Sequence, residues 1–293
     1  MLVRGIINQA LRGKEDTMRL LRTYTILLLC LAALLAFGGL ANASPTPTDP
    51  KDIVFKAFDD FHKLKNYHTS LEMQSETTLN GEPFSIALSG EGNCQNQPIV
   101  GNQILNMTIS TGKTKTEKRV VQYFEEAKDQ VYYYTQIENH WLKQTMPKNM
   151  FVQTKSYDNY AKAITKVELK TEDDSSAIYE VTASGPYLKA TMEQYVASMG
   201  MSLFKLDNLD IGDLTYTLVL DKKTARITQI YMDMSPMMEA MGNSLTLSVP
   251  IPETQKMFRE LYGNMKITMK ISFSRYNSAE KVTIPEEVKK QAQ

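Results

Sequence analysis

The sequence contains little cysteine: Cys30 and Cys94 are the two thiols in 293 residues. Cys30 lies in an N-terminal segment that we expect to be removed, so Cys94 would be alone in the mature chain. A single cysteine excludes an intramolecular disulfide, and a chain of this length can fold without one. The letters GEGNCQNQP around Cys94 are polar and turn-forming, which predicts an incidental thiol in a loop.

Histidine is scarce too, with three in the chain, and recognisable catalytic motifs are missing. His62 follows Asp59 and Asp60, but a zinc site needs three or four converging ligands, so this pattern favours a solvated acidic helix face. The sequence has no phosphate-binding glycine loop with its lysine and no nucleophile elbow. We therefore predict no catalytic residues, no metal and no cofactor, and a protein that is not an enzyme.

An excess of positive charge is also missing, since 33 basic residues balance 33 acidic ones. Removal of residues 1–43 takes away five basic and two acidic side chains, which leaves 28 and 31 and a formal net charge of −3. Nothing in this distribution forms a basic patch. Nucleic acid is therefore excluded as an expected partner.

One long apolar run occurs, from Ile26 to Leu40. Two arginines precede it and the small-residue pattern Ala-Asn-Ala follows it, which predicts a secretory signal peptide over residues 1–43, cleaved after Ala43. A retained membrane anchor is the alternative, but the run is shorter than the roughly 20 residues that a spanning helix needs. We expect an exported protein, periplasmic or extracellular, without a stable membrane anchor.

The same segment leaves two smaller questions. A lipobox requires a small residue directly before its cysteine, and Leu29 precedes Cys30, so we reject a lipoprotein. Residues 1–17 are more than a signal peptide needs, and Met1 and Met18 both stay open as the true start.

The rest of the chain contains regular periodicities. Residues 44–50, SPTPTDP, are typical of a linker, and residues 51–293 are expected to form a single domain. Helical spacing and proline or glycine boundaries predict helices after Asp49 and over 155–167, 185–200 and 252–263. Alternation predicts strands over these further segments: 71–79, 84–90, 104–111, 129–136, 139–144, 177–183, 214–221, 225–234 and 266–276. Helices grouped between strand runs argue an α+β fold with an antiparallel sheet.

Several short motifs follow this order: LKNYH after the first helix, W-x-K at Trp141 and Lys143, the hairpin LDKKTARITQI and a closing IPEEVKKQA. In these respects the chain resembles the LolA/LppX-like superfamily of exported bacterial proteins, in particular an uncharacterised LolA-like branch. The resemblance implies a strongly curved antiparallel sheet, a half-barrel, with helices against its concave face. It also implies that a lipid or acyl group is held in the hollow between sheet and helices.

Methionine is abundant, with five in the twelve letters YMDMSPMMEAMG, residues 231–242. Strand alternation followed by a short helical turn places these five together, and methionines of the preceding helix can join them. Ordinary core, the lining of an adaptable cavity and a Cu(I) site all fit the pattern, because methionine is flexible and its thioether is soft. The predicted ligand-binding residues are Met192, Met199, Met232, Met234, Met237, Met238 and Met241.

These observations give two hypotheses of different kinds. The first is an exported, non-enzymatic protein that binds a lipid or another hydrophobic small molecule between its sheet and its helices. The second is an envelope sensor or scaffold whose core is filled by its own side chains and whose partner is an envelope protein. A ligand-sized apolar space would favour the first, and a solid core would favour the second.

Overall fold

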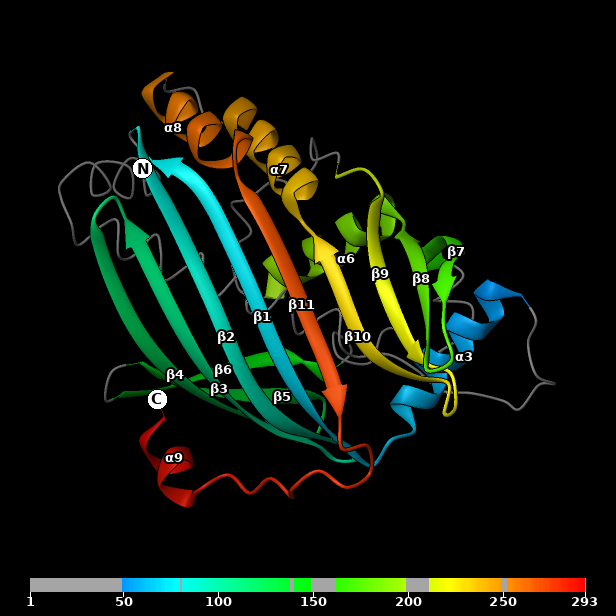
Figure 1. Ribbon diagram of the computed structural model, residues 1–293. Coiled ribbons are helices and arrows are strands. Elements are labelled where there is room, and N and C mark those ends of the chain that lie inside the picture. The colour runs from blue at the N-terminus through cyan, green and yellow to red at the C-terminus, as the bar shows by residue number, and fades with distance from the viewer. Residues whose placement is uncertain are drawn as a thin grey trace. The chain divides into compact units, whose positions relative to one another are not determined.

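The computed structural model of the chain describes residues 49–79, 81–137, 140–148, 162–198, 211–248 and 252–292 (Figure 1). All of them belong to one compact unit, Gly38–Gln293. The predicted signal peptide with its cleavage site after Ala43 lies outside the described residues, and so do residues 44–48 of the predicted linker. No helix within the described ranges is long and apolar enough to cross a membrane.

Eleven strands form one open sheet in the order β6-β5-β4-β3-β2-β1-β11-β10-β9-β8-β7. Each neighbouring pair is antiparallel, which confirms the predicted antiparallel sheet. The first and last strands, β1 and β11, pair side by side in the middle (Figure 1). The strands are β1 (Asn66–Leu79), β2 (Glu82–Asn96), β3 (Ile99–Thr111), β4 (Thr114–Ala127), β5 (Gln130–Ile137), β6 (His140–Pro147), β7 (Ile164–Glu172), β8 (Ser176–Ala183), β9 (Leu214–Asp221), β10 (Arg226–Asp233) and β11 (Lys266–Ser274).

Helices accompany the sheet, as an α+β fold requires. They are α3 (Pro50–His62), α6 (Gly185–Ser198), α7 (Ser235–Ser248), α8 (Pro252–Gly263) and α9 (Glu286–Gln291). Helix α3 begins as its sequence predicts: the Asp49 side chain accepts a 2.7 Å hydrogen bond from the backbone N–H of Lys51, and Pro50 occupies the first turn. Such a cap satisfies a backbone donor that the helix itself leaves unpaired.

One face of the sheet, called here the helix face, carries the buried side chains of the central strands. On β1 and β11 these are the odd-numbered residues, for example Met73 and Met269, which are 4% and 1% exposed. Three helices contact this face: the Phe61 ring of α3 stacks against Tyr67 and Phe273 at centroid distances of 4.7 and 4.8 Å, and α7 and α8 contact β11 and β1. The alternate residues of β1 and β11 lie on the opposite face and are mostly charged or polar.

The C-terminal segment packs against the opposite face. Val288 of α9 and Ile284 form a buried cluster with Tyr134 of β5, and Trp141 of β6 packs against this cluster. Lys289 donates a 2.6 Å hydrogen bond to Glu125, and the Tyr134 hydroxyl donates one of 2.9 Å to the same carboxylate. Burial and the Glu125 hydrogen bond both raise the pKa of the Tyr134 phenol. The tail is therefore anchored by apolar and charged contacts together.

The predicted elements were wrong in three places. Residues 164–167, predicted as the end of a helix, belong to strand β7, and residues 155–161 lie outside the described ranges. Strand β4 was not predicted, because most of its side chains are half-exposed and its letters TKTEKRVVQYFEEA do not alternate cleanly. The turn predicted after Pro236 is a helix of fourteen residues, α7.

Candidate ligand-binding site

The predicted methionine group begins where β10 ends. Met232 lies on β10, Met234 directly follows it, and both are 1% exposed. The backbone N–H of Met234 donates a 2.8 Å hydrogen bond to the carbonyl of Ile267, which ties this corner to β11. The Ser235 hydroxyl accepts a 2.9 Å bond from the N–H of Ile267 and so reinforces the same junction.

Helix α7 then brings two further predicted residues to the same region. Met237 and Met238 are 3% and 2% exposed, and the N–H of Met238 bonds the carbonyl of Met234 at 3.1 Å. Four of the seven predicted residues are thus buried around one corner between the sheet and α7. The side chains of Met192 in α6 and Met241 in α7 lie outside the described residues, as does Met199 altogether.

Pairing across the sheet shows a methionine row that the sequence analysis missed. Met232 pairs with Met269, Met269 with Met73, Met73 with Leu88, and Leu88 with Met107. Directly paired residues lie about 5 Å apart, so these five side chains form a continuous apolar row across five strands. The sequence did contain a sign of this row: within each strand, the methionine alternates with polar residues and so falls on the same face as the other apolar residues.

A polar contact joins α8 to the sheet, and a glycine allows α7 to pack closely on α8. The Thr77 hydroxyl, on the helix face of β1, donates a 2.6 Å hydrogen bond to the carbonyl of Leu261 in α8. Gly242 of α7 lies so close to α8 that a Cβ there would come within 2.2 Å of Tyr262 Cβ. A side chain at position 242 would therefore push the two helices apart.

The helix face changes character toward β4, β5 and β6. Val120 and Phe124 of β4 and Tyr133 of β5 are half-buried, and Leu142 of β6 is 42% exposed. Val120 pairs with Leu105 and Phe124 with Gly101 of the buried centre, and Tyr133 pairs in turn with Phe124. Leu142 pairs with Thr135, which pairs with Gln122 of β4. Within the described residues this is where the apolar helix face is accessible, so a ligand can enter the site here, whereas the methionine corner is closed to solvent.

Cys94 is a correction to the predicted loop thiol. It lies in strand β2, is 2% exposed, and pairs directly with Tyr67 of β1, itself 1% exposed. The polar residues around it belong to a strand, and the glycines Gly92 and Gly101 let neighbouring groups approach the backbone closely. A Cβ on Gly101, for example, would lie 2.0 Å from the Phe124 ring. Burial raises the pKa of the Cys94 thiol to about 12, and burial also raises the pKa of the Tyr67 phenol.

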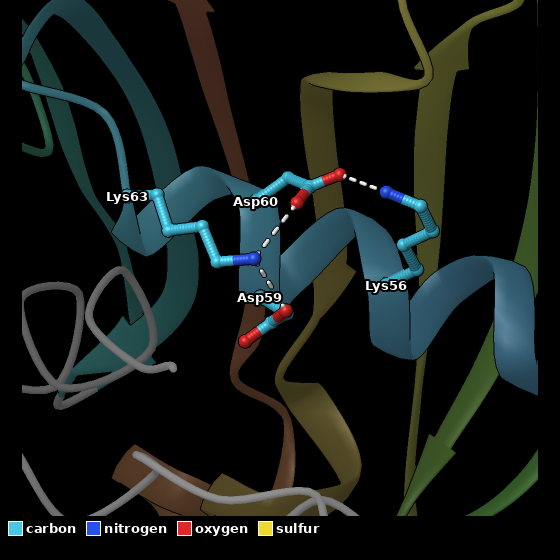
Figure 2. A network of polar contacts seen from close by, with 4 residues as sticks. All are labelled: Lys56, Asp59, Asp60 and Lys63. Atoms are coloured by element: carbon cyan, nitrogen blue, oxygen red, sulfur yellow. Dashed lines mark hydrogen bonds and ion pairs between the residues drawn. The ribbon is translucent and has the colours of Figure 1, made fainter. Parts of the chain in front are cut away.

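The acidic pair on α3 is held by lysines. Lys63 donates hydrogen bonds to Asp59 at 3.1 Å and to Asp60 at 3.3 Å, and Lys56 bonds Asp60 from the other side (Figure 2). Burial opposes the charge on Asp60, but the bonds from Lys56 and Lys63 outweigh it and lower the pKa of that carboxyl. Among the described residues no group of three or more His, Cys, Asp or Glu could hold a metal ion.

Comparisons with known proteins assign a family but no activity. A model described as "Family of unknown function (DUF6612)" matches residues 49–293. No curated protein matches the chain. Among solved structures, the chain is similar to LprF from Mycobacterium bovis, with 12% identity, a TM-score of 0.39 and coverage of 83% of this chain and 99% of that one. It is also similar to a DUF1329 family protein from Desulfovibrio piger, with 9% identity, a TM-score of 0.24 and coverage of 80% and 96%. Similarity at these TM-scores says nothing about a ligand.

Proposed function

The chain belongs to the DUF6612 family, which assigns no activity, and from its own residues we propose an exported, non-enzymatic protein that binds a lipid or another hydrophobic ligand. The ligand lies on the helix face of the sheet, between strands and helices. Residues 1–43 act as the signal peptide, so the exported chain starts at Ser44. N-terminal sequencing of the exported form tests that start.

The observation that carries this proposal is the gradient of exposure along the helix face. Met232 and Met269 are 1% exposed, Met73 and Leu88 are 4%, and Met107 is 7%. Farther along, Val120 and Phe124 of β4 and Tyr133 of β5 are half-exposed and Leu142 of β6 is 42% exposed, whereas Val131 and Thr135 between them are buried. A continuous apolar surface that is sealed at one end and accessible at the other suits an elongated apolar ligand.

The methionines have a specific role in this proposal. Met192, Met199, Met232, Met234, Met237, Met238 and Met241 form the adaptable end of the site, because methionine side chains can repack around ligands of different shapes. The sheet is proposed to curve around the ligand as in LolA/LppX-like proteins, with the helices on its concave face. The contacts of α3, α7 and α8 with one face support this arrangement.

One observation also favours the second candidate function, that of a sensor or scaffold. Exposures of 1–3% at Met232, Met234, Met237 and Met238 are also what a self-filled core would show. The protein would then be an envelope sensor or scaffold that acts through a protein partner. Nucleic acid is excluded from both proposals by the lack of a basic excess.

Native mass spectrometry of the exported protein, followed by organic extraction, distinguishes the two. A lipid carrier should show additional masses that disappear after extraction and appear in the organic phase. The double variant Met234→Ser/Met238→Ser should lose these masses if the buried end of the site holds the ligand. A single mass equal to the polypeptide, unchanged by incubation with a lipid mixture, would leave the self-filled scaffold as the better account.

A further inference from the structure

Lys118 occupies an unusual place on β4. Even-numbered residues of β4 point to the helix face, and Lys118 pairs directly with Met107 of β3. It therefore extends the row that runs from Met232 through Met269, Met73 and Leu88. An apolar row across five strands thus ends in a single positive charge.

The Lys118 side chain is half-buried and has no ion-pair partner within the described residues. An ammonium group beside apolar side chains gains free energy from a charged or hydrogen-bonding partner. Lys148, which directly follows β6, has such a partner, because it forms an ion pair with Glu126 of β4. The charged neighbours of Lys118 in sequence, Glu117 and Arg119, lie on the opposite face.

Two apolar side chains lie on the same face of the strand in the C-terminal direction from Lys118. Val120 and Phe124 follow on the same face of β4, with Gln122 between them, whose amide donates a 3.2 Å hydrogen bond to the Thr135 hydroxyl. At about 3.3 Å per residue, the distance from position 118 to position 124 is about 20 Å, the scale of a long acyl chain. The run ends at Phe124, which pairs with Tyr133 of β5, and the exposed Leu142 lies two strands from Gln122 in the next row.

We infer that the ligand of the proposed site is an anionic amphiphile, whose headgroup pairs with Lys118 and whose chain lies along the helix face of β4 and β5. This inference rests on the proposed function and narrows its ligand class. A lysine ammonium is a compact point charge that binds a carboxylate or a phosphate equally well. Neutral amphiphiles lack the ion pair, and cationic ones are repelled.

Four probes with one chain and different headgroups test the inference: oleate, oleyl phosphate, oleyl alcohol and oleylamine. Each displaces a fluorescent fatty acid from the full exported protein after its bound lipid is removed, at submicellar concentrations. Oleate and oleyl phosphate should bind at least tenfold more tightly than oleyl alcohol, and oleylamine should bind least. A preference between the first two then separates a carboxylate headgroup from a phosphate headgroup.

Three variants assign the preference to Lys118. Lys118→Gln should reduce oleate affinity to that of oleyl alcohol, and Lys118→Glu should invert the order so that oleylamine binds better than oleate. Arg119→Gln is the matched control, because it removes a positive charge from the next residue on the opposite face and should leave the preference unchanged. Circular dichroism of each variant verifies that it is folded.

The outcomes separate the two proposals. Equal binding of oleate and oleyl alcohol by the unmodified protein would overturn the headgroup inference and leave hydrophobic binding intact. A preference that persists in Lys118→Gln, or that Arg119→Gln removes equally, would also overturn it. Failure of all four probes to displace the fluorescent ligand would overturn both the inference and the proposed function.

Discussion

The buried thiol of Cys94 shows how a single residue departs from its local sequence. The residues around it are polar, yet Cys94 pairs with Tyr67 of β1, so its side chain lies on the buried helix face. Sequence reasoning failed here because the end of β2 around Cys94 contains glycine and asparagine, which have low strand propensity by themselves. Pairing with β1 on one side and β3 on the other overrides that propensity.

Cys94 should resist thiol reagents in the folded protein. Only the thiolate reacts, and the pKa of about 12 keeps the group protonated at pH 8, while 2% exposure blocks access. Titration with Ellman's reagent should give little reaction under native conditions and one thiol per chain in guanidinium chloride. Rapid stoichiometric reaction of the native protein would show that Cys94 is accessible, as a thiol in an exposed loop would be.

Substitutions at Met234 and Met238 test whether these residues are needed for their sulfur atoms or for their apolar volume. Met234→Leu/Met238→Leu conserves volume and apolarity, so each change should cost less than about 1.5 kcal/mol of unfolding free energy. Met234→Ser/Met238→Ser removes buried apolar volume and should cost about 2–5 kcal/mol at each position, as other large-to-small core changes do. Urea unfolding of both variants measures the difference.

A Cu(I) titration with a competing chelator is the opposing measurement for the same residues. Cavity lining predicts no tight binding by the unmodified protein, and therefore no change in the Leu variant. Tight stoichiometric binding that the Leu variant abolishes would establish a thioether copper site instead.

At the scale of elements, the clearest expectations came from clean alternation and from helix caps. The segments AIYEVTA and ARITQIYMDM alternate buried and exposed side chains and are strands, and the Asp49-Pro50 start of α3 forms as predicted. Strand β4 was missed because it lies where the helix face is half-open, so neither of its faces is fully apolar. The methionine row could not be predicted, since it depends on register between β1 and β11, which are far apart in the chain.

We expect that the C-terminal helix α9 can detach while the central strands stay folded, because it packs on side chains of β3, β4, β5 and β6 at one end of the sheet. Val288→Asp places a charge in the cluster with Ile284 and Tyr134 and should release the tail. Trp141 packs on this cluster and is the single tryptophan of the chain, so its emission should shift to longer wavelength.

Lys290→Asp is the control for this change, because Lys290 is exposed on the same helix. It should leave the Trp141 emission unchanged and the tail resistant to proteolysis. Identical spectra for Val288→Asp and the unmodified protein would show that the tail does not depend on its apolar contact.

For the molecule as a whole, the helix face combines two demands that conflict. The central strands must be sealed to stabilise a sheet that is open at β6 and β7, and a ligand site must stay accessible. The structure separates these demands in space, with exposures of 1–7% from Met232 to Met107 and half-exposed side chains at Val120, Phe124 and Tyr133. Ligand binding at the open part should therefore add stability to a sheet that is already folded.

This separation predicts a ligand-dependent melting temperature. At a free ligand concentration of 100 times its Kd, binding adds about 2.7 kcal/mol to the free energy of unfolding, which for a domain of this size corresponds to a rise of about 5–10 °C.

Leu142→Asp should abolish most of this rise with little effect on the unliganded protein, because Leu142 is 42% exposed at the open end of the helix face. Leu169→Asp is the matched control, since Leu169 is equally exposed, at 42%, on the other edge strand, β7, and should keep the full rise. Scanning calorimetry with and without oleate measures each difference. An unchanged melting temperature in the unmodified protein at saturating oleate would show that the helix face binds no such ligand, and equal losses in both variants would show that the site is not at the β6 end.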